Sequence, residues 1–238
     1  MKPLNGFLTA CPWMTKLTPE QQSRVQSDTV KRSYSAGSFI CRRGERLDHW
    51  LGVVEGLAVL ICDSAEGKPS TFVTLSEGSW FGEGSLLKNQ PLKFEAFVKK
   101  DCQVACMPRS TFIWLYETSI DFNHALIDQL NERCGQFLGI MTCERVGTVE
   151  ERVAQCMMSL LNPVLYPGTG PSLQLSQEEI GYLSGLSRQM VNRALKNLEQ
   201  AGLIKVEFRH VTVLNLDGLI NFTVDRRAVT LPPAAAPG

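Results

Sequence analysis

The side chains best suited to specific recognition chemistry are concentrated in residues 187–196, which read SRQMVNRALK. The polar members of this stretch can all donate hydrogen bonds: Ser187, Arg188, Gln189, Asn192, Arg193 and Lys196. Arginine makes two parallel hydrogen bonds to guanine, and glutamine or asparagine makes two to adenine, because the major-groove edges of these bases offer matching groups. The stretch therefore predicts direct contact with DNA bases, and the lysine is available for phosphates.

A helix must present these polar residues on one face. Apolar residues recur at the i, i+3, i+4 and i+7 positions that form one buried face of a helix, namely Val191, Ala194, Leu195 and Leu198. Ser187 can cap this helix, since its hydroxyl can accept a hydrogen bond from a backbone N–H of the first turn. Gly202 is placed to end it.

A shorter helix is predicted directly before the turn. Ser176 and Glu179 stand in the S-x-x-E spacing of a capping box. We expect the apolar face of this helix to consist of Ile180, Tyr182 and Leu183. Gly185 can take the positive φ that a sharp corner requires. Two helices joined by such a turn form a helix-turn-helix, whose second helix enters the major groove of DNA.

Two short strands are predicted after the helix-turn-helix. Residues 204–206 and 210–213 alternate as strands do, and Glu207, Phe208 and Arg209 separate them. A helix-turn-helix followed by a hairpin is a winged helix, which favours DNA binding. The alternative is a small-ligand, redox or haem sensor module whose helix-turn-helix is only structural, although such a hairpin has no need of an arginine- and amide-rich outer face.

The overall composition is that of an ordinary globular protein. The chain has 238 residues, 44% of them hydrophobic, and its 24 Lys and Arg residues balance its 24 Asp and Glu residues. This balance gives no sign of nucleic acid, but a local basic face is enough to contact phosphates. No apolar run is long enough to span a membrane, and residues 1–13 lack the pattern of a signal peptide. We therefore expect a cytoplasmic protein with no membrane partner.

The cysteines give no metal-binding or disulfide pattern. There are eight, and without an export signal they are expected to be reduced thiols that act as small buried hydrophobes. Cys102 and Cys106 are the close pair, expected in a strand-to-loop region, and no C-x-x-C is present. No nucleophile motif, metal-ligand spacing or P-loop supports an enzyme. The cofactor, if there is one, stays unidentified.

The amino-terminal half predicts a β-roll. Residues 1–28 are expected to form a short helical lead-in, with Thr18 capping a helix that starts at Pro19. Between Val30 and Phe112, glycines separate short apolar or alternating runs, which is typical of an antiparallel sandwich or barrel. The expected strands are 39–41, 51–54, 57–62, 71–75, 95–98 and 103–107.

A long helix is predicted next, over about Ile120 to Cys143. Five of its residues recur at alternating spacings of three and four, as in a heptad seam: Ile127, Leu130, Cys134, Phe137 and Met141. The seam needs a partner, and a parallel two-fold dimer is the simplest solution. The alternative is that the seam packs on its own barrel. Gly135 and Gly139 within the helix indicate a close helix approach or a local bend.

These elements predict an α+β fold. We expect a β-roll sensor domain with its lead-in (residues 1–118), a dimerisation helix and hinge (119–146), a winged helix-turn-helix domain (147–224) and a disordered tail (225–238). Thr148 and Glu151 form another capping box, which marks the start of the last domain.

With these parts in order, the chain resembles the Crp/Fnr (catabolite activator/fumarate–nitrate regulator) family of bacterial transcription factors over about Val30 to Leu216. The residues that carry the resemblance are Ala36-Gly37, Gly44, Val53-Val54-Glu55-Gly56, Glu77 to Glu83 and Leu186 to Leu195. The resemblance implies a cyclic-nucleotide-type β-roll, a homodimer, a two-fold symmetric DNA site and RNA polymerase as a partner.

The effector site is where the sequence departs from the family. The resemblance places it at Gly82, Glu83, Ser85 and Lys93. Members that bind cyclic AMP follow Gly-Glu with Arg-Ser or Arg-Thr, but here the pair is Leu92-Lys93, or Phe94-Glu95 in another alignment. Lysine cannot make the forked contact of arginine with a phosphate. We therefore expect an effector other than cyclic AMP, and interpret Glu83 as a loop carboxylate that orients backbone.

The cysteines and histidines bear on two other sensor types of the family. Iron–sulfur members carry a cluster of amino-terminal cysteines, but only Cys11 precedes the roll. Haem-sensing members need a His or Cys ligand, for which His49 and Cys62 are candidates by residue type alone. The sequence leaves the effector unnamed.

Overall fold

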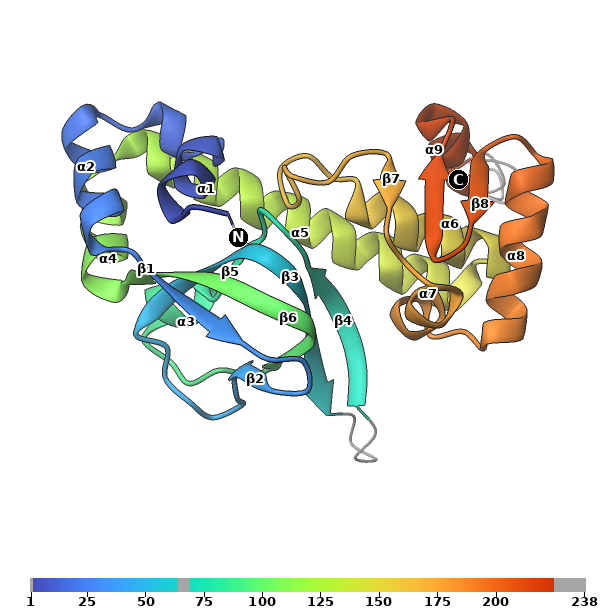
Figure 1. Ribbon diagram of the computed structural model, residues 1–238, viewed down its shortest axis with the longest axis horizontal. Coiled ribbons are helices and arrows are strands. Elements are labelled where there is room, and N and C mark those ends of the chain that lie inside the picture. The colour runs from blue at the N-terminus through green and yellow to red at the C-terminus, as the bar shows by residue number, and fades with distance from the viewer. Residues whose placement is uncertain (1, 64–68, 225–238) are drawn as a thin grey trace, which may run out of the picture. The chain divides into compact units, whose positions relative to one another are not determined.

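The computed structural model describes residues 2–63 and 69–224 (Figure 1). The tail predicted to be disordered, residues 225–238, lies outside the described residues. The chain forms two compact units. The first contains the chain up to Gly135 together with Asn162–Thr169, and the second contains Gln136–Leu161 and the chain from Gly170 onward.

The first unit begins with the predicted helical lead-in: α1 (Leu4–Ala10), the short helix η1 (Met14–Lys16) and α2 (Pro19–Asp28). The Thr18 hydroxyl accepts from Gln21 N at 3.3 Å, and the Gln21 side chain accepts from Thr18 N at 3.1 Å. This reciprocal box satisfies backbone groups that a helix end leaves free. The predicted start of α2 is confirmed.

An antiparallel sheet in the order β1-β6-β3-β4 follows (Figure 1). Its strands are β1 (Val30–Tyr34), β2 (Phe39–Cys41), β3 (His49–Asp63), β4 (Pro69–Leu75), β5 (Trp80–Phe81) and β6 (Glu95–Pro108). β2 pairs with β6, and β5 pairs with β3. The β-rich sensor fold predicted from the glycine spacing is therefore present.

Four of the predicted strands are halves of longer ones. Residues 51–54 and 57–62 are both part of β3, and residues 95–98 and 103–107 are both part of β6. Gly56 interrupts the pattern without ending β3, because it takes φ 104° where the register shifts. The placement of Cys102 and Cys106 in a strand-to-loop region was wrong, since both lie within β6.

The sheet has separate apolar clusters inside and outside the roll. The inner cluster includes Leu51, Val53, Phe81 and Leu92. The outer cluster joins the lead-in helices and the following helices through an aromatic group made of Trp13, Trp50, Trp80, Phe112 and Phe122. Trp50 and Trp80 lie 4.4 Å apart between ring centroids. The outer cluster therefore holds α4 (Arg109–Thr118) and the start of the next helix on the roll.

The long helix α5 (Ile120–Val146) runs a little beyond its predicted end and passes from the first unit into the second (Figure 1). Gly139 lies against α6 (Val149–Leu160), and a Cβ there would meet the Gln155 amide at 2.5 Å. The predicted close helix approach is therefore confirmed at Gly139, whereas open space surrounds Gly135 and no contact explains it. In the described part of the chain, no helix is long and apolar enough to cross a membrane.

Residues 162–169 return to the first unit between two elements of the second. Tyr166 is fully buried, and its hydroxyl donates to the Thr74 carbonyl at 2.9 Å. The Asn162 amide donates to Glu132 of α5 at 2.6 Å. A segment expected to be only a connecting loop is thus anchored on the roll and on α5.

The second unit contains the predicted winged helix-turn-helix. Its elements after α6 are β7 (Ser172–Leu173), α7 (Gln177–Ser184), α8 (Arg188–Gln200), β8 (Ile204–Glu207), β9 (His210–Val213) and α9 (Leu216–Val224). The three strands pair antiparallel in the order β7-β9-β8. Glu207, expected between the strands, belongs to β8.

Candidate nucleic-acid interface

Helix α8 buries its regularly spaced apolar residues and exposes most of its polar ones, although the apolar Met190 is also 38% exposed. Val191, Ala194, Leu195 and Leu198 are all buried, as their spacing predicts. The exposed residues of the opposite side are Arg188, Gln189, Arg193 and Lys196. The Ser187 hydroxyl accepts from Met190 N at 3.3 Å and caps the helix. The long hydrogen-bonding side chains are therefore directed to solvent at the amino-terminal half of α8.

Asn192 has a different environment from its polar neighbours. It is half-buried, and its amide donates to Gln177 Oε1 at 3.1 Å. This bond joins the start of α7 to the middle of α8. The structure therefore places Asn192 as a link between the helices, while Arg188, Gln189 and Arg193 stay exposed.

The turn between α7 and α8 is closed by small residues. Gly185 takes φ 64°, as its position in the sequence predicts. Gly181 is buried, and a Cβ there would lie 2.7 Å from the Leu186 carbonyl. The prediction that Tyr182 belongs to the buried face of α7 was wrong, because Tyr182 is 39% exposed and Gly181 is buried instead. The close return of the chain past α7 leaves room only for glycine there.

Arg152 of α6 fixes the same turn. One of its guanidinium nitrogens donates to the Ser184 carbonyl at 2.7 Å and to the Gly185 carbonyl at 3.4 Å. These carbonyls belong to the last residue of α7 and to its C-cap, where a helix leaves acceptors without intrahelical partners. Sequence reasoning missed Arg152, because its partners are backbone atoms far along the chain.

The wing is tied to the end of α8. Glu199 accepts from Val206 N at 2.7 Å, so the helix and β8 are held together. At the tip of the hairpin, Phe208 is 93% exposed and Arg209 takes φ 55°. The wing therefore presents one aromatic and one basic side chain to solvent.

The four residues assigned to the effector site lie in different environments. Gly82 takes φ 96° and Glu83 is the first residue of α3 (Glu83–Lys88), so its placement in a loop was wrong. The Glu83 carboxylate accepts from the Trp50 indole at 3.4 Å and thus faces the outer aromatic cluster. Ser85 is half-buried and Lys93 is exposed.

Two positions can be aligned with the arginine of the cyclic AMP binders, and both strengthen the departure from that pattern. Leu92 is buried in the inner cluster, and Phe94 packs against the same cluster. Apolar side chains therefore stand at both alternative positions of the missing arginine. The one cation of the four assigned residues, Lys93, is directed to solvent.

Four buried cysteines of the first unit are poor nucleophiles. Burial raises the pKa of Cys11, Cys102 and Cys106 to about 11, and that of Cys41 to about 12. A reactive thiol requires a lowered pKa. The interpretation of these cysteines as buried hydrophobes is confirmed.

The haem-ligand candidates do not share a site. His49 and Cys62 lie near opposite ends of β3, and a strand rises about 3.3 Å per residue. They are therefore too far apart to ligate one iron. Within residues 2–63 and 69–224, no group of three or more His, Cys, Asp or Glu side chains is placed to hold a metal ion.

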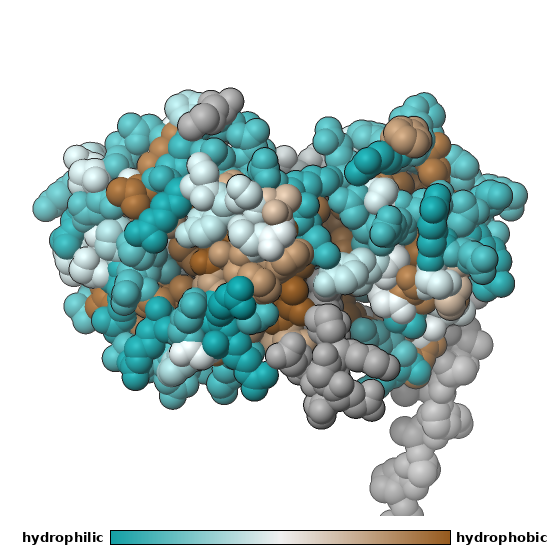
Figure 2. Space-filling model, turned by 60° about the horizontal axis from the view of Figure 1, so that its bottom comes forward, coloured by the Kyte–Doolittle hydropathy of each residue, from teal (hydrophilic) through white to brown (hydrophobic). Residues whose placement is uncertain are grey.

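The predicted seam of α5 is exposed along its length. Ile127 is 61% exposed and Met141 48% exposed, and Leu130, Cys134 and Phe137 are exposed as well. In the single chain, the seam therefore does not pack on its own roll. The surface drawn in Figure 2 is mainly hydrophilic, with hydrophobic residues exposed in places.

Two family descriptions match the chain in succession. The cyclic nucleotide-binding domain matches residues 31–119, and the Crp-like helix-turn-helix domain matches residues 151–222. The chain belongs to the Crp/Fnr family of transcriptional regulators. It is thus a DNA-binding regulator with an effector-binding domain, and it is not an enzyme.

Curated relatives of this Crp/Fnr chain are described as cAMP-activated global transcriptional regulators. Vfr of Pseudomonas aeruginosa is 28% identical over 195 residues, which cover 77% of this chain and 88% of Vfr. CRP of Salmonella typhimurium is 27% identical over 189 residues, which cover 76% of this chain and 87% of CRP.

Solved structures share the fold. FixK2 from Bradyrhizobium japonicum has a TM-score of 0.65 at 21% identity, with 81% of this chain and 96% of FixK2 covered. A CooA mutant from Carboxydothermus hydrogenoformans has a TM-score of 0.63 at 18% identity, with 84% and 89% covered.

The hydrogen bonds from Arg152 to the Ser184 and Gly185 carbonyls, called the Arg152 clamp below, give a first prediction. Replacing Arg152 with Met should destabilise the end of α7 by about 1.5–3 kcal/mol, because hydrogen bonds from a charged group are lost. Amide exchange in α7 should then accelerate, by about tenfold or more. Exchange measured by mass spectrometry can test this, with Arg145→Met, an exposed residue of α5, as the control. Equal exchange in both variants would show that the clamp contributes nothing.

Proposed function

We propose that this regulator acts as a two-fold homodimer that reads a symmetric DNA site through α8 and responds to an effector other than cyclic AMP. The observation that carries the proposal is the division of α8 into a fully buried apolar face and an exposed face with Arg188, Gln189 and Arg193. A hairpin with a purely structural role has no need of this exposed face.

The exposed side chains support a specific pattern of base contacts. Arg188 and Arg193 each carry the planar fork that fits guanine O6 and N7. Gln189 carries a donor and an acceptor, which fit adenine N7 and N6. Lys196 lies farther along α8 and suits a phosphate. Asn192 bonds Gln177, and its contribution is to hold α8 against α7.

The dimer is supported by the exposed seam of α5. Apolar side chains at Ile127, Leu130 and Phe137 would be removed from water by a second copy of the same helix. A two-fold axis along this seam would also give the two reading helices that a symmetric DNA site requires. RNA polymerase is the further partner, since a regulator bound at a promoter must act on transcription.

The departure at the effector site supports a signal other than cyclic AMP. Leu92 and Phe94 pack on the inner cluster where relatives named as cAMP-activated would need an arginine. The neighbouring cation, Lys93, is exposed. A phosphate placed there would lose its hydration without gaining a forked partner.

Base reading can be tested by changing one exposed residue. Gln189→Glu should shift preference at one base pair of each half-site towards C·G by about 1–3 kcal/mol, because a carboxylate only accepts hydrogen bonds and selects the cytosine amino group. Selection from a random DNA pool with both proteins would show the shift. Lys196→Ala is the matched control, and should weaken all sequences about equally and lower the salt slope by about one. Identical selected motifs from wild type and Gln189→Glu would contradict the assignment.

The seam can be tested with a single charge. Leu130→Glu should raise the dimer dissociation constant by at least about 100-fold, because an unpaired buried charge costs several kcal/mol. Sedimentation velocity at several concentrations gives this constant. His124→Glu, on the same helix but outside the seam, should leave it unchanged. A stable dimer of the Leu130→Glu variant would mean that the chain associates through another surface.

Cyclic AMP should neither bind the roll nor tighten DNA binding, since Leu92 and Phe94 stand where the cyclic AMP binders place the arginine for the phosphate. Calorimetry with cyclic AMP up to about 1 mM should show no saturable heat, which corresponds to a binding free energy weaker than about −4 kcal/mol. Clear binding at micromolar concentration would overturn the proposed departure from the cAMP-activated relatives.

A further inference from the structure

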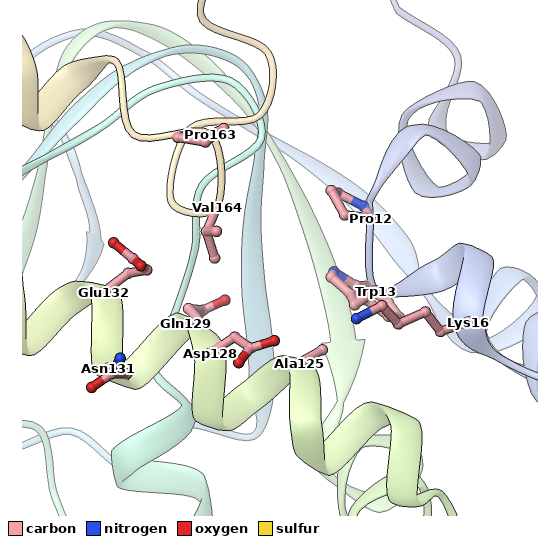
Figure 3. A pocket seen from close by; sticks show the side chains of 10 residues that line it. All are labelled: Pro12, Trp13, Lys16, Ala125, Asp128, Gln129, Asn131, Glu132, Pro163 and Val164. Atoms are coloured by element: carbon pink, nitrogen blue, oxygen red, sulfur yellow. The ribbon is translucent and has the colours of Figure 1, made fainter. Parts of the chain in front are cut away.

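A pocket of about 260 Å³ lies in the first unit, apart from the residues that the family resemblance assigned to an effector (Figure 3). Its walls come from η1 and the residues before it, from α5, and from the segment after α6. They include Trp13, Lys16, Asp128, Gln129 and Val164. The volume suits a small metabolite rather than a drug-sized ligand, whose pockets begin near 300 Å³.

Opposite charges face each other in this pocket. Figure 3 shows the Lys16 ammonium and the Asp128 carboxylate directed into the same space from opposite sides. Both residues are exposed, and in the described part of the chain neither forms an ion pair or a hydrogen bond. The other carboxylate of the lining, Glu132, already accepts from Asn162 at 2.6 Å. One positive and one negative group are therefore available to a ligand.

Trp13 adds a donor that the protein does not use. Its side chain is only 7% exposed, and its indole N–H has no acceptor among the described residues. The nitrogen lies on the pocket side of the ring in Figure 3. A buried donor without a partner is costly, so an acceptor supplied by a ligand would stabilise this wall.

The remaining wall is formed by apolar groups and one amide. Pro12, Ala125, Pro163 and Val164 line the pocket. The Gln129 amide donates to the Trp80 carbonyl at 3.3 Å, while its oxygen points into the pocket in Figure 3. The lining therefore combines a hydrophobic surface with an ammonium, a carboxylate, an N–H donor and a carbonyl acceptor.

We propose that this pocket is the effector site and takes an apolar α-amino acid in its zwitterionic form, an assignment that rests on the proposed function. The ligand carboxylate binds Lys16 and the Trp13 N–H, its ammonium binds Asp128 and the Gln129 oxygen, and its side chain lies on the proline and valine surface. An amine alone leaves Lys16 unpaired, and a carboxylic acid alone leaves Asp128 unpaired.

The walls connect the pocket to both functional parts of the chain. Ala125, Asp128, Gln129 and Glu132 share one face of α5 at i, i+3, i+4 and i+7, about half a turn from the Leu130 seam. Pro163 and Val164 belong to the segment that Tyr166 anchors on the roll. This segment continues covalently into α6 on one side and β7 on the other. A ligand in the pocket therefore biases the position of α5 and of the two ends of the segment 162–169.

Three probes with the same branched side chain separate the charge requirements. L-leucine carries both charges, 3-methylbutylamine only the positive one and 4-methylpentanoate only the negative one. Calorimetry on the full chain without DNA should show L-leucine binding with a dissociation constant of about 10 µM to 1 mM. The amine and the acid should each bind at least about tenfold more weakly, because one charged hydrogen bond is lost.

Matched variants locate the site. Asp128→Asn and Lys16→Gln should each weaken L-leucine binding by about tenfold or more, whereas Asp121→Asn, on the same helix outside the pocket, should not. L-leucine should change the affinity for a selected DNA site by at least about fivefold in wild type and not in Asp128→Asn. Absence of L-leucine binding, binding that survives both variants, or binding without an effect on DNA affinity would overturn the proposal. Absence of specific DNA binding both with and without L-leucine would instead contradict the proposed function.

Discussion

The four apolar side chains on the inner face of α8 fix how this helix is rotated on the second unit. Val191, Ala194, Leu195 and Leu198 are buried, so any rotation of α8 that moved Arg188 or Gln189 inward would also expose apolar surface. The Arg152 clamp and the Asn192–Gln177 bond then set the position of α7 relative to α8. The packing of the inner face therefore keeps the outer face directed to solvent, as the proposed base contacts require. We therefore expect base recognition and stability to be coupled in this unit.

The roll is organised differently from α8. Its interior is filled by apolar residues, and Glu83 faces the aromatic cluster outside it. The apolar interior of the roll supports the proposal that the signal is not cyclic AMP. A signal that enters through the lead-in helices, α5 and the segment 162–169 would act on elements that the outer aromatic cluster and Tyr166 already hold in place.

Local patterns predicted most of the elements. The capping boxes at Thr18, Thr148 and Ser176 and the buried face of α8 depend on residues close in sequence, and all are present in the structure. What could not be predicted depends on distant contacts. The continuity of β3 through Gly56 needs β6 to pair with it, and the buried state of Gly181 needs the returning chain. The partners of Arg152 are backbone carbonyls, which no residue type reveals. Likewise, Lys16 and Asp128 are far apart in sequence, and only the fold places them in one pocket.

The stoichiometry of the DNA complex shows most directly whether two copies joined through α5 read DNA together. Sedimentation equilibrium of the full chain with a duplex that contains an inverted repeat should show two chains per duplex. A duplex with one half-site should bind more weakly by a factor of about 100 or more, because both reading helices contribute when the chains are joined. One chain per duplex, or equal affinity for the half-site and the complete site, would contradict the proposal that two copies joined through α5 read DNA together.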